Sequence, residues 1–386
     1  MSWISSSSNR TTKTIWRIDS TGISVMVLQD KTNRVLYYDF QPITFFTIDV
    51  RHRYDQLMHH SELIITRMAQ GLISFLKKPA TNVVVVLGEP WTQGIRRHIV
   101  YKRKTPFTLT RAFIDDLVER DMKRINQEYK RNHGNIIELL PPTYHELQIA
   151  GHPNHDAFGK VVNDIRLTYT TGFSDPAIIA LVKVLIHEKT KVRMINIKFD
   201  QYQNYVMRFW KHITFPSGVI IDMSGYITDI YIFQNNELVQ AGTLPIGLSN
   251  FRQQIAYGLG IYTTELESLF ALYQKKILDE AITVKIDREL EKVYHIWERY
   301  FQKFCHTAVS HGDILDQVIW LGNEYDPILS YFMNILHADP LSFPVIFGSS
   351  HVGFIHSDSI LDVLHNYNHV TKLQNQDRII VAALID

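Results

Sequence analysis

Two segments of the chain share a pattern in which apolar strands flank a short polar turn. The first reads RIDSTGISVMVL from Arg17, and the second reads IIDMSGYITDIYIF from Ile220. Runs of β-branched and aromatic residues that are bounded by Asp, Ser, Thr and Gly are typical of strands joined by a turn. Each segment continues into a further apolar run, so each predicts a three-stranded meander.

The two turns are copies of one motif, Ile-Asp-x-Ser/Thr-Gly. The shared positions are Asp19, Thr21 and Gly22 in the first copy and Asp222, Ser224 and Gly225 in the second. A repeated unit indicates duplicated architecture, and the wide spacing of the copies predicts two lobes rather than a solenoid. An Asp at the mouth of a turn either holds a ligand or makes an ordinary Asx turn. The residues alone leave both readings open.

Elsewhere the apolar spacing changes to three and four residues, which predicts helices. We expect helices near 54–77, from about 108 to 131 and over roughly 286–309. The run Ser174-Asp175-Pro176 predicts another helix start, because Asp is a good cap and Pro fits the first turn. Thr264 and Glu267 have the spacing of a capping box. Strands and helices alternate, so we predict an α/β fold.

Composition excludes several classes of protein. The chain has 386 residues, of which 45% are hydrophobic and 20% charged, as expected for globular units with sizeable cores. Lys and Arg total 40 against 39 Asp and Glu, which gives no reason to expect a nucleic-acid partner. No apolar run approaches the ~20 residues that a membrane span needs, so we expect no direct membrane insertion.

The chemistry-bearing residues form no known catalytic pattern. The single cysteine, Cys305, lies in an apolar helical stretch, so we predict a core position and no disulfide framework. Walker, Rossmann, nucleophile-elbow and HExxH patterns are absent, and we assign no catalytic residue. The basic run 96–104 is expected to be a solvated strand face, with contact to an acidic or phosphate-bearing partner as the alternative.

Four segments together resemble the actin-like ATPase superfamily, and within it the FtsA/PilM-like proteins of bacterial cell division and pilus assembly. Residues 219–233 are similar to the second phosphate turn of that family. Residues 238–270 follow its order of strand, Pro-x-Gly-Gly turn and Glu-x-x-Lys helix. Residues 83–121 resemble the small subdomain that FtsA and PilM insert in the first lobe, and 318–336 take the place of the adenosine-side turn.

The resemblance implies an actin-like (ribonuclease H-like) α/β fold of two lobes, with a small α+β subdomain inserted in the first. The polar, Ser-rich N-terminus predicts a disordered tail (1–13). The resemblance divides the rest into the first lobe in two parts (14–80 and 171–212), the inserted subdomain (81–170) and the second lobe (213–386).

In that superfamily the two turns grip the phosphates of a nucleotide through backbone N–H groups, and Asp residues hold Mg²⁺ and its waters. The resemblance implies that ATP and Mg²⁺ would bind through Asp19, Ser20, Thr21, Gly22, Asp222, Ser224, Gly225, Thr228, Gly247, Glu267, Gly322 and Asn323. Asp19 and Asp222 would be the metal residues. We expect Thr228 and Asp229 to have structural roles.

The sequence departs from the family where glycine would approach phosphate. Thr21 and Ser224 each replace a turn glycine, and Leu248 replaces the second glycine of Pro-x-Gly-Gly. Phe270 replaces the nucleotide-contacting lysine, and Asn323 replaces a glycine of the adenosine turn. Because glycine reaches backbone conformations that other residues rarely adopt, we predict weak or lost ATP binding.

We therefore expect a cytoplasmic scaffold of bacterial cell division or of type IV pilus or secretion assembly. It would work through protein partners and would be able to self-associate into an oligomer or filament. Attachment to the inner membrane would go through a partner. The alternative is an active ATPase or kinase of the same superfamily.

Overall fold

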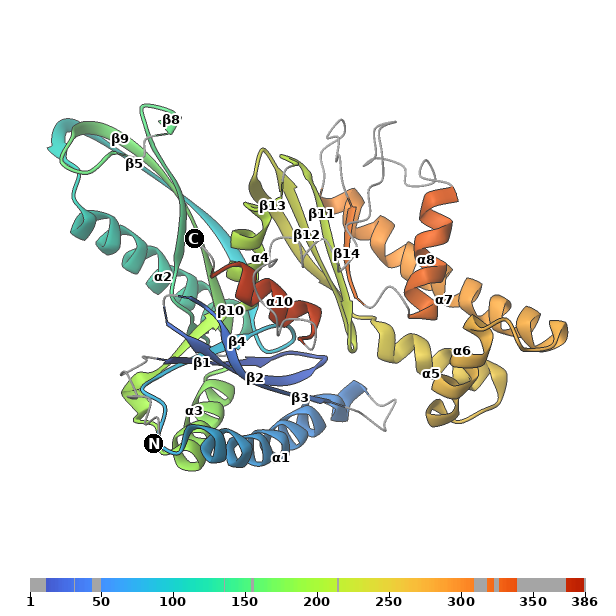
Figure 1. Cartoon of the computed structure of the whole chain (residues 1–386). Helices are drawn as coiled ribbons and strands as arrows, with labels where there is room; N and C mark the ends of the chain where they lie inside the picture. The colour runs from blue at the N-terminus through green and yellow to red at the C-terminus, as the bar shows by residue number, and fades with distance from the viewer. Residues whose placement is uncertain are drawn as a thin grey trace, which may run out of the picture. The chain divides into compact units, whose positions relative to one another are not determined.

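The computed structural model (Figure 1) divides into two compact units, which are described one by one. The first comprises Met1–Asp19 and Ile23–Asn204, and the second comprises Ser20–Gly22 and Tyr205–Asp386. The structure describes residues 12–30, 32–43, 50–134, 136–153, 156–213, 215–308, 318–322, 326–338 and 373–384. Residues 1–11 of the predicted tail lie outside this set, and the first strand begins at Thr12.

The main sheet of the first unit is mixed, with strand order β10-β4-β1-β2-β3. Its strands are β1 (Thr12–Ile18), β2 (Gly22–Gln29), β3 (Val35–Pro42), β4 (Asn82–Leu87) and β10 (Ile197–Gln201). β2 runs antiparallel to β1, whereas β4 lies parallel to both β1 and β10. A central parallel strand is buried on both faces, which explains why β4 is a continuous run of valines.

Helices α1 (Val50–Leu76) and α3 (Pro176–Thr190) lie together on one side of this sheet (Figure 1). The predicted start of α3 is confirmed, since the Asp175 side chain accepts a hydrogen bond from the Ala177 N–H at 2.8 Å. The short 3₁₀ turn Met194–Asn196 then leads into β10.

A second sheet of the first unit is built around two long strands. Its strands are β5 (Gln93–Thr108), β6 (Glu138–Leu139), β7 (Thr143–Ile149), β8 (His152–Pro153) and β9 (Val161–Ser174). Their order is β5-β9-β7-β8, with β6 paired to β9. The resemblance predicts this subdomain at 81–170, but β4 pairs with the main sheet, and the subdomain sheet begins at Gln93.

Helix α2 (Arg111–His133) packs on this second sheet and carries a buried charge, Asp121. Arg97 of β5 donates two hydrogen bonds to the Asp121 carboxylate, both at 2.9 Å. The Tyr169 hydroxyl of β9 donates a third at 2.7 Å. Burial opposes ionisation, but the bonds from Arg97 and Tyr169 outweigh it and lower the pKa of Asp121. The network joins α2 to both long strands.

We predict that Asp121→Asn lowers the free energy of unfolding by about 2–4 kcal/mol, because it leaves a half-buried guanidinium without its anion. Urea unfolding at pH 7 measures the loss. Asp116→Asn is the matched control, since Asp116 forms an exposed pair with Arg120 on the same helix and should cost less than about 0.5 kcal/mol. Equal losses in the two variants would contradict this account of Asp121.

The second unit repeats the order of the first. Its sheet runs β13-β12-β11-β14, with β11 (Gly218–Ser224), β12 (Ile227–Gln234), β13 (Glu237–Leu244) and β14 (Val318–Leu321). As in the first unit, a three-stranded meander is followed by a strand parallel to its first member. Both predicted meanders are therefore confirmed, and the two sheets share the same order of strands.

Four helices pack with one another and with this sheet around an aromatic core that contains Trp297, Phe332 and Trp320. They are α5 (Leu248–Leu259), α6 (Thr263–Gln274), α7 (Glu280–Ala308) and α8 (Pro327–Ala338). Cys305 belongs to this core, as predicted, and burial raises the pKa of its thiol to about 12. Two shorter helices, α4 (Tyr202–Trp210) and α10 (Asn375–Ala382), complete the described chain.

The start of α6 differs from the prediction. The helix begins at Thr263, and the Glu265 carboxylate accepts the backbone N–H of Tyr262 at 2.9 Å. The capping bond is therefore made by Glu265, so Glu267 is not a capping residue. In the part of the chain that the structure describes, no helix has the length and apolar character needed to cross a membrane.

Candidate functional site

The first turn holds the Asp19 carboxylate against a buried cation. Ile18 of β1 pairs with Ile23 of β2, so residues 19–22 form the turn. Arg17, two residues earlier on the same strand, is fully buried and forms an ion pair with Asp19. A guanidinium at this oxygen neutralises the carboxylate and repels a metal ion. Asp19 is thus less suited to Mg²⁺ than its position in the motif implies.

The rest of this turn has ordinary backbone geometry. Thr21 does not adopt the positive φ that a glycine at this position would allow. Ser20 is buried, and its hydroxyl has no hydrogen-bond partner among the described atoms. Since buried polar groups are nearly always paired, this hydroxyl is the feature of the turn that best fits a bound ligand.

The second turn does not have the shape that the repeat predicts. Asp222 pairs with Asp229 inside the β11–β12 ladder, and the chain reverses at Gly225 and Tyr226. The repeat, which matches Asp222 to Asp19, predicts Asp222 at the mouth of the turn. The paired strands instead extend beyond Asp222, as far as the Ser224–Ile227 pair. Gly225 has a positive φ of 37°, so the glycine is needed here, whereas Ser224 has no such strain.

The acidic residues of the second turn are bound within the fold. Asp222 is 2% exposed and accepts a hydrogen bond from the Gln376 amide of α10 at 2.9 Å. Asp229 accepts one from the Thr243 hydroxyl of β13 at 2.7 Å. The Thr228 hydroxyl donates to the Ile246 carbonyl, also at 2.7 Å. The predicted structural roles of Thr228 and Asp229 fit these contacts.

Gly247 lies directly against the second turn. A side chain at this position would collide with the Ser224 carbonyl and the Ile227 backbone, so only glycine fits. Gly247 also caps α5, and the Ser249 N–H in the first turn of that helix donates to the Gly225 carbonyl at 2.7 Å. A helix N-terminus normally offers its N–H groups to a phosphate, but here one of them is already used.

Two of the remaining predicted residues take part in contacts between helices and loops. Glu267 is 66% exposed and pairs with Arg252 of α5, with Nε and Oε1 3.2 Å apart. Arg252 also pairs with Asp326, which caps α8. Gly322 follows β14, and its carbonyl accepts a hydrogen bond from the Asn375 amide. Asn323 lies outside the described residues.

The predicted residues of the second unit therefore do not form a single cluster. Thr228, Gly247 and the turn at Gly225 lie together at one end of β11 and β12, while Glu267 lies on α6 in a separate ion-pair network. The described residues contain no cluster of three or more His, Cys, Asp or Glu side chains that would hold a metal ion. The donor set fits Mg²⁺ poorly, because Asp19 and Asp222 each have a partner from the protein.

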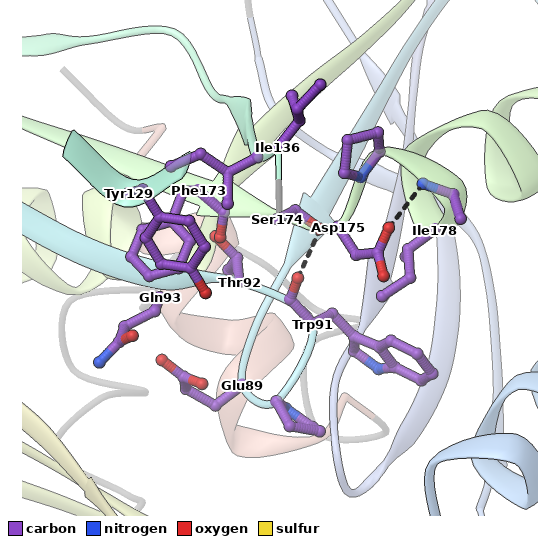
Figure 2. Close-up of a pocket in the computed structure, with 14 residues that line it drawn as sticks. Glu89, Trp91, Thr92, Gln93, Tyr129, Ile136, Phe173, Ser174, Asp175 and Ile178 are labelled. Atoms are coloured by element: carbon purple, nitrogen blue, oxygen red, sulfur yellow. Dashed lines mark hydrogen bonds between the residues drawn. The ribbon is translucent and has the colours of Figure 1, made fainter. Parts of the chain in front are cut away.

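The first unit contains a pocket of about 810 Å³ that no sequence motif predicts (Figure 2). Its walls come from the β4–β5 turn, the C-terminal end of α2 and the junction of β9 with α3. The lining includes Glu89, Trp91, Tyr129, Phe173 and Asp175. These residues come from segments that are far apart in the sequence, so no local motif predicts the pocket.

Hydrogen bonds fix the walls of this pocket. The Ser174 hydroxyl donates to the Trp91 carbonyl at 2.6 Å, and the Thr92 hydroxyl donates to the Phe173 carbonyl at 3.1 Å. The rings of Tyr129 and Phe173 are in contact, with centroids 5.3 Å apart. The pocket is therefore preformed, with an aromatic wall that joins α2 to β9.

Glu89 is the unusual group of the pocket. Its side chain is only partly exposed, and burial raises the pKa of its carboxyl to about 8. No hydrogen bond or ion pair to a described residue reaches this carboxylate. By contrast, Asp19, Asp121 and Asp222 all have partners. Glu89 is thus a carboxyl group that the fold leaves without a partner.

We predict that Glu89→Gln stabilises the protein at alkaline pH. The pKa of Glu89 is higher in the folded state than in the unfolded state. As pH rises from about 4.5 to 8, Glu89 ionises more readily in the unfolded chain, so the free energy of unfolding falls. The variant should match the wild type near pH 4.5 and exceed it by on the order of 1–2 kcal/mol at pH 8.5, allowing for screening by pocket water. Thermal unfolding across this range measures the difference, and a constant offset would contradict the prediction.

No family model matches this sequence, and no curated protein matches it. Solved structures do match over nearly the whole chain. The matched chain of a PilM–PilN type IV pilus biogenesis complex is 10% identical, with a TM-score of 0.56, and the match covers 97% of this chain and 98% of that chain.

Two further matches are weaker. A Bacteroides thetaiotaomicron protein with an actin-like ATPase fold and unknown function is 10% identical, with a TM-score of 0.38 and 96% of each chain covered. The cytoplasmic domain of EpsL, an inner-membrane component of the Vibrio cholerae type II secretion system, is 8% identical with a TM-score of 0.38. That match covers 95% of this chain and 98% of that one.

The chain has an actin-like fold, as the sequence predicted. The match to the PilM–PilN chain runs almost from end to end in both proteins, so it includes the duplicated sheets and the second sheet of the first unit.

Proposed function

We propose that this actin-like chain is a non-catalytic scaffold of a type IV pilus or secretion-type assembly, and that it binds a membrane-anchored protein partner. The observation that carries the proposal is the end-to-end likeness to a chain of the PilM–PilN complex. The eroded phosphate turns favour a scaffold over an enzyme. Attachment through a partner would place the protein at the inner face of the membrane.

Three contacts support weak or lost nucleotide binding. Arg17 forms an ion pair with Asp19, and Gln376 donates a hydrogen bond to Asp222. The Gly225 carbonyl accepts a hydrogen bond from an N–H group at the N-terminus of α5. Each would have to be broken before a magnesium nucleotide could use the same group, which adds to its cost of binding. The twelve residues assigned from the family are proposed as the remnant of a nucleotide site.

The second candidate is an active ATPase or kinase. The buried Ser20 hydroxyl without a partner favours it, because such a group fits a ligand oxygen. Against it stands the absence, among the described residues, of any cluster of three acidic or histidine ligands for a metal.

We predict that about 1 mM Mg-ATP leaves the unfolding temperature unchanged within ~1 °C. A ligand at 100 times its Kd adds about 2.7 kcal/mol, so even a modest site would be seen. Thermal unfolding with Mg-ATP, Mg-ADP and Mg²⁺ alone is the measurement. A rise of several degrees that disappears in Asp19→Ala would support the ATPase and overturn the loss of binding.

The pocket of the first unit is the proposed docking site for the partner. Hydrogen bonds join its walls, it lies beside the exposed Ala177 on α3, and its rim includes Ile136, which is 57% exposed. An exposed apolar residue at the mouth of a preformed pocket is a typical anchor point for a partner.

We predict that Ala177→Trp, which fills the mouth of the pocket, releases the protein from the membrane fraction of its host. Ala180→Trp is the matched control, because Ala180 is an exposed alanine of the same helix that does not line the pocket. Quantitative fractionation of tagged variants is the measurement. If Ala177→Trp stays with the membrane as the wild type does, the pocket is not the docking site.

The phenotype of a deletion separates the two cellular roles. Loss of a pilus or secretion scaffold should abolish surface appendages or secretion while cells divide normally. Cells that grow as undivided filaments would favour the division role instead.

A further inference from the structure

The pocket of Figure 2 presents acidic and aromatic groups together. Among its described lining residues, the titratable side chains are Glu89, Tyr129 and Asp175, and none carries a positive charge. They come from three separate elements: the β4–β5 turn, α2 and the start of α3. Carboxylates beside aromatic faces are the groups that recognise ammonium and guanidinium ions.

We propose that a Lys or Arg side chain of the partner's docking segment enters this pocket and pairs with Glu89. Its alkyl stem would pack against the rings of Tyr129 and Phe173. The inference rests on the proposed docking function and names the chemistry of the partner that the pocket selects.

The unpartnered state of Glu89 carries the proposal. A buried carboxylate is costly unless it is paired, and the described residues supply no hydrogen bond or ion pair to this one. In Figure 2 the Glu89 carboxyl group lies on the same side of the pocket as the Gln93 side chain and the Tyr129 hydroxyl. A cation at this point would complete a site that the fold leaves incomplete.

An anionic occupant fits the pocket less well. The N-terminus of α3 borders the pocket, and a helix N-terminus attracts anions. Here, however, Asp175 caps it and accepts the Ala177 N–H at 2.8 Å. The negative charge of Asp175, joined by that of Glu89 at a pH above about 8, would repel an anion.

Proton release should accompany binding. Burial raises the pKa of Glu89 to about 8 in the empty pocket, and an incoming cation would lower that pKa again. The charged and titratable neighbours are Asp175, Tyr129, the His133 ring in contact with Tyr129, and Asp19 beside Gly88 with its partner Arg17. Below pH 8 the affinity for a cation should therefore rise roughly tenfold for each pH unit.

Three probes of one shape test the charge preference. 4-Phenylbutylamine is cationic, 4-phenylbutanol is neutral and 4-phenylbutyrate is anionic, so they differ only in the terminal group. Titration calorimetry of the full chain at pH 8.5 should show the amine binding at least about tenfold more tightly than the alcohol, with the acid weakest. Between pH 6 and 8 only the amine should gain affinity.

Two variants assign the effect to Glu89. Glu89→Gln should bind amine and alcohol alike and lose the pH dependence, while circular dichroism confirms that it is folded. Glu62→Gln, an exposed change on α1, should behave as the wild type. Equal affinity of the wild type for amine and alcohol, no amine binding at millimolar concentration, or a pH dependence that survives in Glu89→Gln would each overturn the proposal.

Membrane fractionation separates this proposal from the docking function. If Ala177→Trp releases the protein and Glu89→Gln leaves it fully bound, the proposed pairing of Glu89 with a cationic side chain is wrong. The pocket would still be supported as the docking site. If both variants release it while Ala180→Trp and Glu62→Gln do not, both are supported. If neither releases it, the docking site itself is wrong.

Discussion

A charge that leaves water must find a partner, and this constraint separates the two candidate sites of the chain. Asp19, Asp121 and Asp222 are buried acids whose partners come from the protein itself: Arg17, Arg97 and Gln376. Glu89 is partly buried as well, yet no described residue forms a hydrogen bond or ion pair with its carboxylate. The carboxylates of the two turns are thus paired within the fold, whereas the pocket of the first unit contains a carboxylate without such a partner.

Contacts within the fold also satisfy the backbone groups around the second turn. Each unit contains a three-stranded meander whose first strand is flanked by a parallel strand. In the second unit Gly247 packs directly against the backbone of the β11–β12 hairpin. The Ser249 N–H at the start of α5 donates a hydrogen bond to the Gly225 carbonyl of the same hairpin. These contacts stabilise the lobe without a ligand. Under the proposed scaffold role, the shape of this unit would not depend on the supply of nucleotide.

Periodicity and turn chemistry predicted much of the fold, since they are local properties. The meanders, the Asp175 cap of α3 and the core position of Cys305 follow from neighbouring residues alone. The site was harder, because strand register and side-chain pairing are not local. Asp222 aligns with Asp19 in sequence but lies inside a ladder. The pocket joins residues 89, 129 and 173, so only the folded chain reveals it.

Photo-crosslinking in host cells tests the central claim most directly, that this actin-like chain works through the pocket and not through its phosphate turns. A photoreactive side chain would replace Ile136 at the pocket rim or, in a second strain, the partly exposed Thr21 of the first turn. The account predicts that Ile136 crosslinks to a membrane-anchored protein at the same yield before and after ATP depletion, while Thr21 does not. A crosslink that forms only with ATP present, or none at Ile136, would contradict it.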